Sequence, residues 1–353
     1  MLPRVSEPSQ SGGAAPARLR ARRLLAGLFV LLGAFLVTLL FAEALVRLLG
    51  LVEYPQRLHQ SDATNVYVLR PGFRGKTSYG IPLSINALGF RGPEVTAARR
   101  SGMFRILLLG DSICFGAGIR QEETFAAVLE RALNGRGDGV AYEVLNLGTS
   151  GYNSTQEMNL LRMRGLALSP DLVVVAFFSN DIDPFRIAGQ IDPRHRTLVK
   201  IKEAVRENFE LYPFLQERVQ RLRQMLSPKP SMAAAPSAAS AGFGESIASL
   251  AEIRDLAESI GARAFVAILP KLDGLSGNYP LARLHADVLS ACAARGVAAA
   301  DLLPYFSGED PASLWLRPTD GHPNARGHAI IGRGLLDLLE TRSLLSGAGG
   351  ESP

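Results

Sequence analysis

Apolar, strand-like runs alternate with helix-like segments through most of this chain, and this alternation is what most restricts its fold. The runs are short, rich in Leu, Ile and Val, and bounded by turn residues, as buried strands are; they lie at 104–109, 143–147, 172–178, 263–269 and 297–300. Helix-like segments lie between or after them, at 122–134, 154–167, 245–260 and 324–340. The pattern predicts an α/β three-layer sandwich, with a mostly parallel, doubly wound sheet and right-handed crossovers.

Polar residues follow three of these strands and precede the last helix. Ser112 comes after Gly110 and Asp111, directly past the first strand. Open α/β folds place their chemistry at the carboxyl ends of strands, so Ser112 is a candidate nucleophile. Three later segments add a glycine-containing loop, an amide and an acid–histidine pair: Asn146–Asn153 (NLGTSGYN), Phe177–Asp181 (FFSND) and Asp320–Asn324 (DGHPN).

Together these residues supply the groups that ester cleavage needs. A serine hydroxyl is a weak nucleophile until a base takes its proton, and the imidazole of His322 titrates near neutral pH. Asp320 is placed to orient that ring and stabilise its charged form. The tetrahedral intermediate needs fixed hydrogen-bond donors: the backbone N–H groups of Ser112 and Gly151 and the side-chain amide of Asn180 are the candidates.

The four segments resemble the blocks of the SGNH, or GDSL, hydrolase family, over about Phe104 to Leu339. The resemblance implies a flavodoxin-like sheet and hydrolysis of esters through an acyl-serine. It also implies oxyanion roles for the Ser, Gly and Asn, and a C-terminal Asp and His that complete the site.

The acid and the histidine are closer in sequence than is usual in that family. The family commonly has Asp-x-x-His, whereas Asp320 and His322 are separated only by Gly321. Residues two apart in an extended segment point the same way, so contact remains possible. The alternative is a Ser–His dyad in which a backbone carbonyl orients His322.

The remaining chemistry-bearing residues are interpreted as structural. Asp111 adjoins the nucleophile and is expected to brace the turn, and His328 is expected to be packed or solvated. The two cysteines, Cys114 and Cys292, make no disulfide framework, and packing is the expected role of Cys114. No metal-ligand spacing and no phosphate-binding glycine loop is found, so we expect no metal and no cofactor. No motif surrounds the other histidines, His59, His195 and His285.

An uncharged apolar run at 24–42 predicts a membrane-spanning helix, because it approaches the ~20 residues that cross a bilayer. Arginines precede it, whereas the charges after it nearly balance, so the positive-inside rule places the N-terminus in the cytoplasm. A cleaved signal peptide is the alternative, although its apolar core is usually only ~7–15 residues long. Residues 1–23 hold four of the chain's five net positive charges, which gives no basis for nucleic-acid binding.

The expected organisation follows from these features. A disordered cytoplasmic tail (1–23), an anchor (24–46) and a lead-in strap of short β-like pieces (47–100) precede the hydrolase domain. That domain covers 101–342 and is followed by a disordered tail (343–353). An insertion at about 184–242 interrupts it. Its amphipathic stretch 202–226 is read as a lid, an arm against the membrane, or a surface insertion that packs on the core.

The sequence therefore predicts a single-pass protein of a bacterial inner membrane with an extracytoplasmic serine esterase domain. The expected substrates are O-acylated glycans or other envelope esters. The alternatives are an O-acyltransferase of an envelope polysaccharide, a lipid esterase, and a catalytically inactive assembly or binding subunit.

Overall fold

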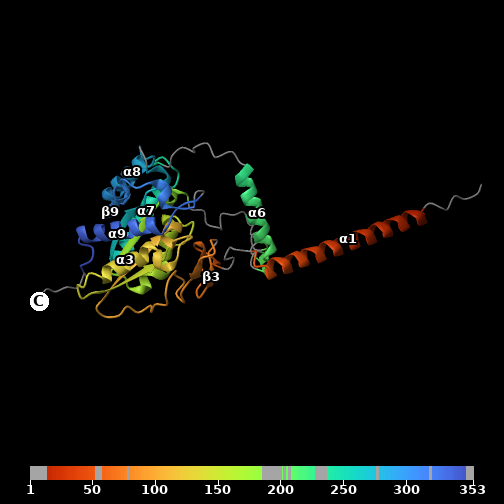
Figure 1. Cartoon of the computed structure of the whole chain (residues 1–353), viewed down its shortest axis with the longest axis horizontal. Helices are drawn as coiled ribbons and strands as arrows, with labels where there is room; N and C mark the ends of the chain where they lie inside the picture. Colours follow the sequence, from red (N-terminus) through yellow and green to blue (C-terminus); the bar gives the residue numbers. More distant parts are fainter. Residues whose placement is uncertain are drawn as a thin grey trace, which may run out of the picture.

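The computed structural model describes residues 14–51, 58–77, 79–184, 201, 204–205, 208–226, 237–275, 278–317 and 320–346. An α/β body lies at one end of the molecule, and a long N-terminal helix extends away from it (Figure 1).

The α/β body is built on a five-stranded sheet in the order β6-β5-β7-β8-β9, with every pairing parallel. Its strands are β5 (Met103–Gly110), β6 (Ala141–Asn146), β7 (Leu172–Phe177), β8 (Arg263–Ile268) and β9 (Ala299–Asp301). All six residues of β7 (LVVVAF) are buried, as expected for a central strand covered on both faces. The predicted α/β fold with a parallel sheet is confirmed.

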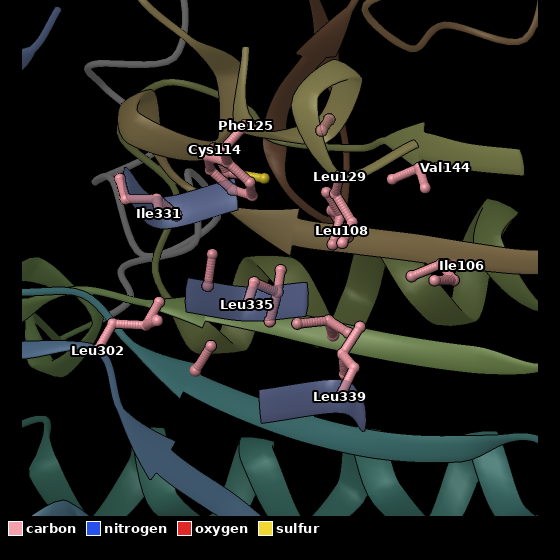
Figure 2. Close-up of a cluster of buried hydrophobic side chains, with 14 of the residues drawn as sticks. Ile106, Leu108, Cys114, Phe125, Leu129, Val144, Leu302, Ile331, Leu335 and Leu339 are labelled. Atoms are coloured by element: carbon pink, nitrogen blue, oxygen red, sulfur yellow. The ribbon is translucent and has the colours of Figure 1, made fainter. Parts of the chain in front are cut away.

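Two hydrophobic clusters cover the two faces of the sheet, and alternate residues of β5 point into each. Ile106 and Leu108 enter the cluster beneath α3 (Phe125–Asn134) and α9 (Ala325–Thr341), as Figure 2 shows. Leu107 and Leu109 enter the cluster on the other face. That face is covered by α4 (Ser154–Leu160), α7 (Phe243–Glu258) and α8 (Ala282–Ala294).

Helix α8 was not expected from the sequence. It buries Leu284, His285, Val288 and Cys292, whereas most of its other positions are small or polar. A stripe this narrow, among many alanines, gives a weak helical signal. The predicted helix 154–167 is likewise divided: α4 continues into a π-helical turn at Leu161–Gly165 and a 3-10 turn at Leu166–Leu168.

The segment before β5 forms two antiparallel hairpins, as the β-like pieces of the strap predicted. The first pairs β1 (His59–Asp62) with β2 (Val66–Leu69), and the second pairs β3 (Arg74–Lys76) with β4 (Pro82–Ser84). Leu69, Leu83 and Ile85 pack with Phe115, so the hairpins join the core just behind the candidate nucleophile.

Helix α1 runs from Ala14 to Leu48, and its part Arg22–Leu48 is long and apolar enough to cross a membrane. Residues 14–23 are therefore helical rather than disordered, since Ala, Leu and Arg are strong helix formers that extend the apolar helix. Residues 343 and 344, predicted to belong to a disordered tail, are held on the α/β body: Leu344 is buried in the core and Arg263 donates to the carbonyl of Ser343.

The insertion contains α6 (Leu211–Leu226), which lies beside the C-terminal end of α1 (Figure 1). Of the predicted amphipathic stretch 202–226, residues 202, 203, 206 and 207 fall outside the described residues. Residues 1–13, 185–200 and 347–353, with His195 among them, fall outside them too.

Candidate active site

The carboxyl end of the sheet brings the predicted segments together. Gly110, at the end of β5, pairs with Ala176 near the end of β7, so the loops after these strands are neighbours. The loop after β6 joins them, because Thr149 N donates to Gly110 O at 2.9 Å. Three of the four segments thus meet at one edge, as expected for an open parallel sheet.

Ser112 opens the short helix α2 (Ser112–Phe115) directly after β5. Asp111 caps this helix: its carboxylate accepts from Ile113 N at 2.8 Å. The turn requires glycine at position 110, since a Cβ there would lie 2.5 Å from the Cβ of Cys114. Asp111 is 3 % exposed, and burial raises the pKa of its carboxyl.

A continuous chain of hydrogen bonds runs from Ser112 to Asp320. Ser112 Oγ lies 2.9 Å from His322 Nε2, and His322 Nδ1 lies 2.6 Å from Asp320 Oδ1. The His322 side chain is 35 % exposed, which leaves the ring open to a substrate. These are the contacts of a nucleophile, a base and an orienting acid.

The short Asp-Gly-His spacing works because this segment is extended. Asp320–Pro323 forms β11, which pairs with β10 (Trp315–Arg317), and α9 begins only at Ala325. Asp320 and His322 therefore project to the same side. The same Asp320 oxygen also accepts from His322 N at 3.0 Å, which fixes the carboxylate against its own backbone. A carbonyl-oriented dyad is unnecessary in this geometry.

Two of the three oxyanion candidates, Gly151 and Asn180, line one hollow. Gly151 and Asn180 both border a depression of about 260 Å³ beside the strap. Gly151 has φ of 81°, which favours glycine, and a Cβ there would lie 2.9 Å from the hydroxyl of Tyr67. Asn180 lies in a 3-10 turn, Ser179–Ile182, shortly after the end of β7. Its Nδ2 donates to Tyr152 O at 3.2 Å.

A comparison with known protein families identifies the family of this chain. The GDSL-like Lipase/Acylhydrolase family matches residues 108–330, which is more than half of the chain and spans all four segments. The chain belongs to the GDSL-like lipase/acylhydrolase family. It is accordingly a hydrolase of ester bonds.

Solved structures of similar proteins include esterases of this family. TesA is 17 % identical, with a TM-score of 0.42, over 67 % of this chain and 98 % of its own. A catalytic mutant of Axe2, an acetylxylan esterase from Geobacillus stearothermophilus, is 16 % identical, with a TM-score of 0.43, over 70 % and 97 %. A search of curated proteins returned no match.

The strap contributes two tyrosines to this hydrolase site that the sequence did not single out. Tyr79 donates its hydroxyl to Asp320 Oδ2, the oxygen that His322 does not use. Arg317 lies over the Tyr79 ring at 4.7 Å. Partial burial by itself raises the pKa of the Asp320 carboxyl. The hydrogen bonds from Tyr79 and His322 outweigh this effect, so the pKa is lowered. Tyr79 thus holds the acid of the GDSL-like site from outside the family match.

Tyr67 makes the corresponding contact on the oxyanion side. Its hydroxyl donates to Ser150 O at 2.8 Å, which fixes the peptide that precedes Gly151. Asn65 and Gln156 lock the same hairpin to α4 by exchanging hydrogen bonds, each side-chain amide donating to the other backbone at 2.8 and 2.9 Å. No local motif marks either tyrosine, because both contacts join residues more than 80 positions apart.

A second hollow, of about 300 Å³, opens on the histidine side of the hydrolase site. Ile113, Phe178 and Leu272 give it apolar walls, and Lys271 and Asp273 add charge. His285 supports this wall from behind: Asp301 lies 2.9 Å from its Nδ1, and Tyr279 lies 3.3 Å from its Nε2 and accepts from Lys271 N. The candidate acid and base, Asp320 and His322, both line this hollow.

Two carboxyls, of Glu157 and Asp181, are buried in the α/β body. Glu157 and Asp181 are 0 % and 1 % exposed, and both Glu157 oxygens and Asp181 Oδ1 have no hydrogen-bond partner among the described residues. Burial, and then the proximity of other carboxyls, raises the pKa of both well above the usual range. Burial therefore favours the protonated form of both carboxyls.

The residues interpreted as structural have structural surroundings. His328 is buried, stacks on Phe125 and accepts from Phe125 N at 3.2 Å; burial lowers its pKa to about 3. Cys114 and Cys292 are buried and free. Within the described residues, no group of three His, Cys, Asp or Glu side chains is arranged to hold a metal ion.

Proposed function

We propose that this hydrolase cleaves an ester through a covalent acyl-Ser112 intermediate. The observation that carries the proposal is the unbroken hydrogen-bond chain Ser112–His322–Asp320 at the edge of the sheet. With its Nδ1–H donated to Asp320, His322 presents Nε2 as the acceptor that a serine hydroxyl needs.

The chemistry proceeds in two halves. Ser112 Oγ attacks the ester carbonyl carbon while its proton passes to His322 Nε2, and the carbonyl oxygen becomes an oxyanion. The N–H groups of Ser112 and Gly151 and the amide of Asn180 stabilise this oxyanion. His322 then protonates the leaving alcohol, and the acyl group remains on Ser112. Water, deprotonated by His322, releases the acid and restores the serine.

The hollow that Gly151 and Asn180 line favours a short acyl group. Ligand pockets usually have about 300–1,000 Å³, and the depression next to Gly151 and Asn180 has about 260 Å³. Its other lining residues include Asn153, Gln156 and Asp183, which suit a polar substrate better than a long alkyl chain. Small acyl esters of sugar hydroxyls combine these two properties.

The placement we propose is the outer face of a bacterial inner membrane. Helix α1 is the anchor, and the arginines before its apolar part keep its N-terminus in the cytoplasm. The strap then connects the anchor to a hydrolase domain that ends near residue 342. A catalytic domain outside the cytoplasm meets the esters of the cell envelope, so O-acylated envelope glycans are the proposed substrates.

Transfer of the acyl group to a polysaccharide hydroxyl uses the same acyl-Ser112, with the hydroxyl in place of water. Steady-state assays on the purified full chain in detergent separate the possibilities. We expect acetate release from O-acetylated oligosaccharides and short-chain esters, with little activity on long-chain esters. Faster turnover of long-chain lipid esters would contradict the glycan assignment. Acyl transfer that exceeds hydrolysis when acceptor glycan is added would identify a transferase.

A further inference from the structure

Helix α6 carries an exposed apolar face. Leu215, Val219 and Leu222 are 49 %, 47 % and 55 % exposed. At 100° per residue these three positions fall within about 60° of one another on the helix. A face of this kind on a helix of 16 residues needs a partner, because exposed apolar surface is costly in water.

The start of α6 is fixed to the end of α1. Glu43 accepts hydrogen bonds from the backbone N–H groups of Glu210 and Leu211, at 2.9 and 2.7 Å. Arg47 donates to Asn208 O at 2.6 Å. Glu43 is only 8 % exposed and supplies the acceptors that the first turn of a helix lacks. The junction is therefore a specific contact between the two helices.

This junction lies where the apolar span ends. The candidate span is Arg22–Leu48, and an 18-residue window within it has a mean hydropathy of 2.7. Glu43 and Arg47 lie in the last two turns of this span. Figure 1 shows α6 crosswise to α1, at the end of α1 that is nearer the α/β body. A helix crosswise to a spanning helix at the bilayer boundary lies along the membrane plane.

The composition of α6 fits a charged lipid surface. Its sequence (LYPFLQERVQRLRQML) has three arginines and one glutamate among the apolar residues. Arg218 is exposed and lies over the ring of Phe214 at 5.0 Å, so cation and apolar surface are adjacent. Basic amphipathic helices of this kind bind in the interface of anionic bilayers.

We propose that α6 is an interfacial helix whose Leu215–Val219–Leu222 face inserts into the headgroup region of an anionic bilayer next to α1. The lid alternative is disfavoured by the contacts: among the described residues, the hydrogen bonds from the start of α6 to another element go to α1. Insertion of this face holds α6 along the membrane surface, next to the hydrolase domain.

Site-directed spin labels on the full chain test this proposal. Single variants Leu215→Cys, Val219→Cys and Leu222→Cys probe the face, and Gln216→Cys is the matched control. Gln216 is exposed on the same helix and lies about 100° from Leu215, 120° from Leu222 and 60° from Val219, at the edge of the face. Both native cysteines are buried, and the labelled wild-type chain gives the background. Thermal unfolding near the wild-type midpoint shows that each variant is folded.

The labelled proteins are reconstituted into phosphatidylcholine vesicles with about one-third phosphatidylglycerol. Collision rates are measured with oxygen, which concentrates in lipid, and with a neutral nickel chelate, which stays in water. We expect labels at 215, 219 and 222 to favour oxygen several-fold over the chelate, and the label at 216 to favour the chelate. Chelate preference at all four positions would overturn the proposal. Protection of the three face positions from both reagents would also overturn it, because it would mean that protein covers the face.

Discussion

Ser112 Oγ lies 2.9 Å from His322 Nε2, although 210 positions separate the two residues in sequence. Ser112 is placed by the end of β5, and His322 by the β10–β11 hairpin that precedes α9. Strand β5 belongs to the parallel sheet, whereas β11 is held by its contacts with α9. The contact therefore depends on the whole α/β body, and not on a local motif.

The two aspartates next to catalytic candidates should differ sharply in their importance. Replacing Asp320→Asn removes the acceptor for His322 Nδ1–H, and we expect kcat to fall by about 10⁴-fold. Asp111→Asn is the matched control, since asparagine caps helices as well as aspartate does. It should retain most of the activity. Steady-state kinetics on a short-chain ester distinguishes them, and equal losses would assign Asp111 a direct role.

The sheet was predictable from the sequence because its strands are buried on both faces. Runs such as Leu172–Phe177 have no polar residue, and the predicted strands differ from the observed ones by one or two residues at most ends. Helix α8 escaped prediction because alanines dilute its apolar stripe. Local pattern identifies an element only when its buried face is wide enough to be seen.

The candidate site was partly predictable for a different reason. Ser112, Gly151, Asn180 and His322 follow strands or precede a helix, so topology alone brings them to one edge. The contact between Asp320 and His322 depends on local extended structure, which the spacing left open. Tyr67 and Tyr79 were not predictable, because hairpins with no catalytic signature carry them across 83 and 241 positions.

Tyr79 should act as a positioning residue for Asp320. Tyr79→Phe removes one hydrogen bond to a charged group, and such bonds contribute about 1.5–3 kcal/mol. We expect kcat to fall about tenfold with KM little changed, because each 1.4 kcal/mol on the barrier is a factor of ten. Tyr305→Phe, which removes an exposed hydrogen bond from Tyr305 to Asp337 on α9, is the control. A Tyr79→Phe effect confined to stability, with kcat intact, would leave the tyrosine a purely structural role.

Gly151 should be required for the shape of the oxyanion loop. In Gly151→Ala the new Cβ meets the Tyr67 hydroxyl and a φ of 81° is strained, so we expect kcat to fall at least 10²-fold. Gly261→Ala isolates the backbone effect, since Gly261 has φ of 78° and open space around its Cβ position. It should lower stability by about 1 kcal/mol and leave kcat unchanged. Wild-type kcat in Gly151→Ala would remove this loop from the mechanism.

The buried carboxyl of Glu157 should make stability depend on pH. Its pKa is raised in the folded state by burial, from an ordinary value of 4.5. Below that pH the carboxyl is protonated in both the folded and the unfolded state, so its ionisation does not affect stability. The free energy of unfolding falls as pH rises from about 4.5 towards the folded-state pKa. Glu157→Gln cannot ionise, so its melting temperature relative to wild type should increase between pH 5 and pH 8. A difference that is constant across this range would contradict a neutral, buried Glu157.

Covalent labelling of Ser112 tests the central claim most directly. The full chain is treated with a fluorophosphonate probe, and the modified peptide is identified by mass spectrometry. We expect one adduct, on Ser112, that is lost in Ser112→Ala and strongly reduced in His322→Ala, while Ser150→Ala on the neighbouring loop is labelled as wild type. An unlabelled wild-type chain, or equal labelling of Ser112→Ala, would contradict the acyl-serine mechanism.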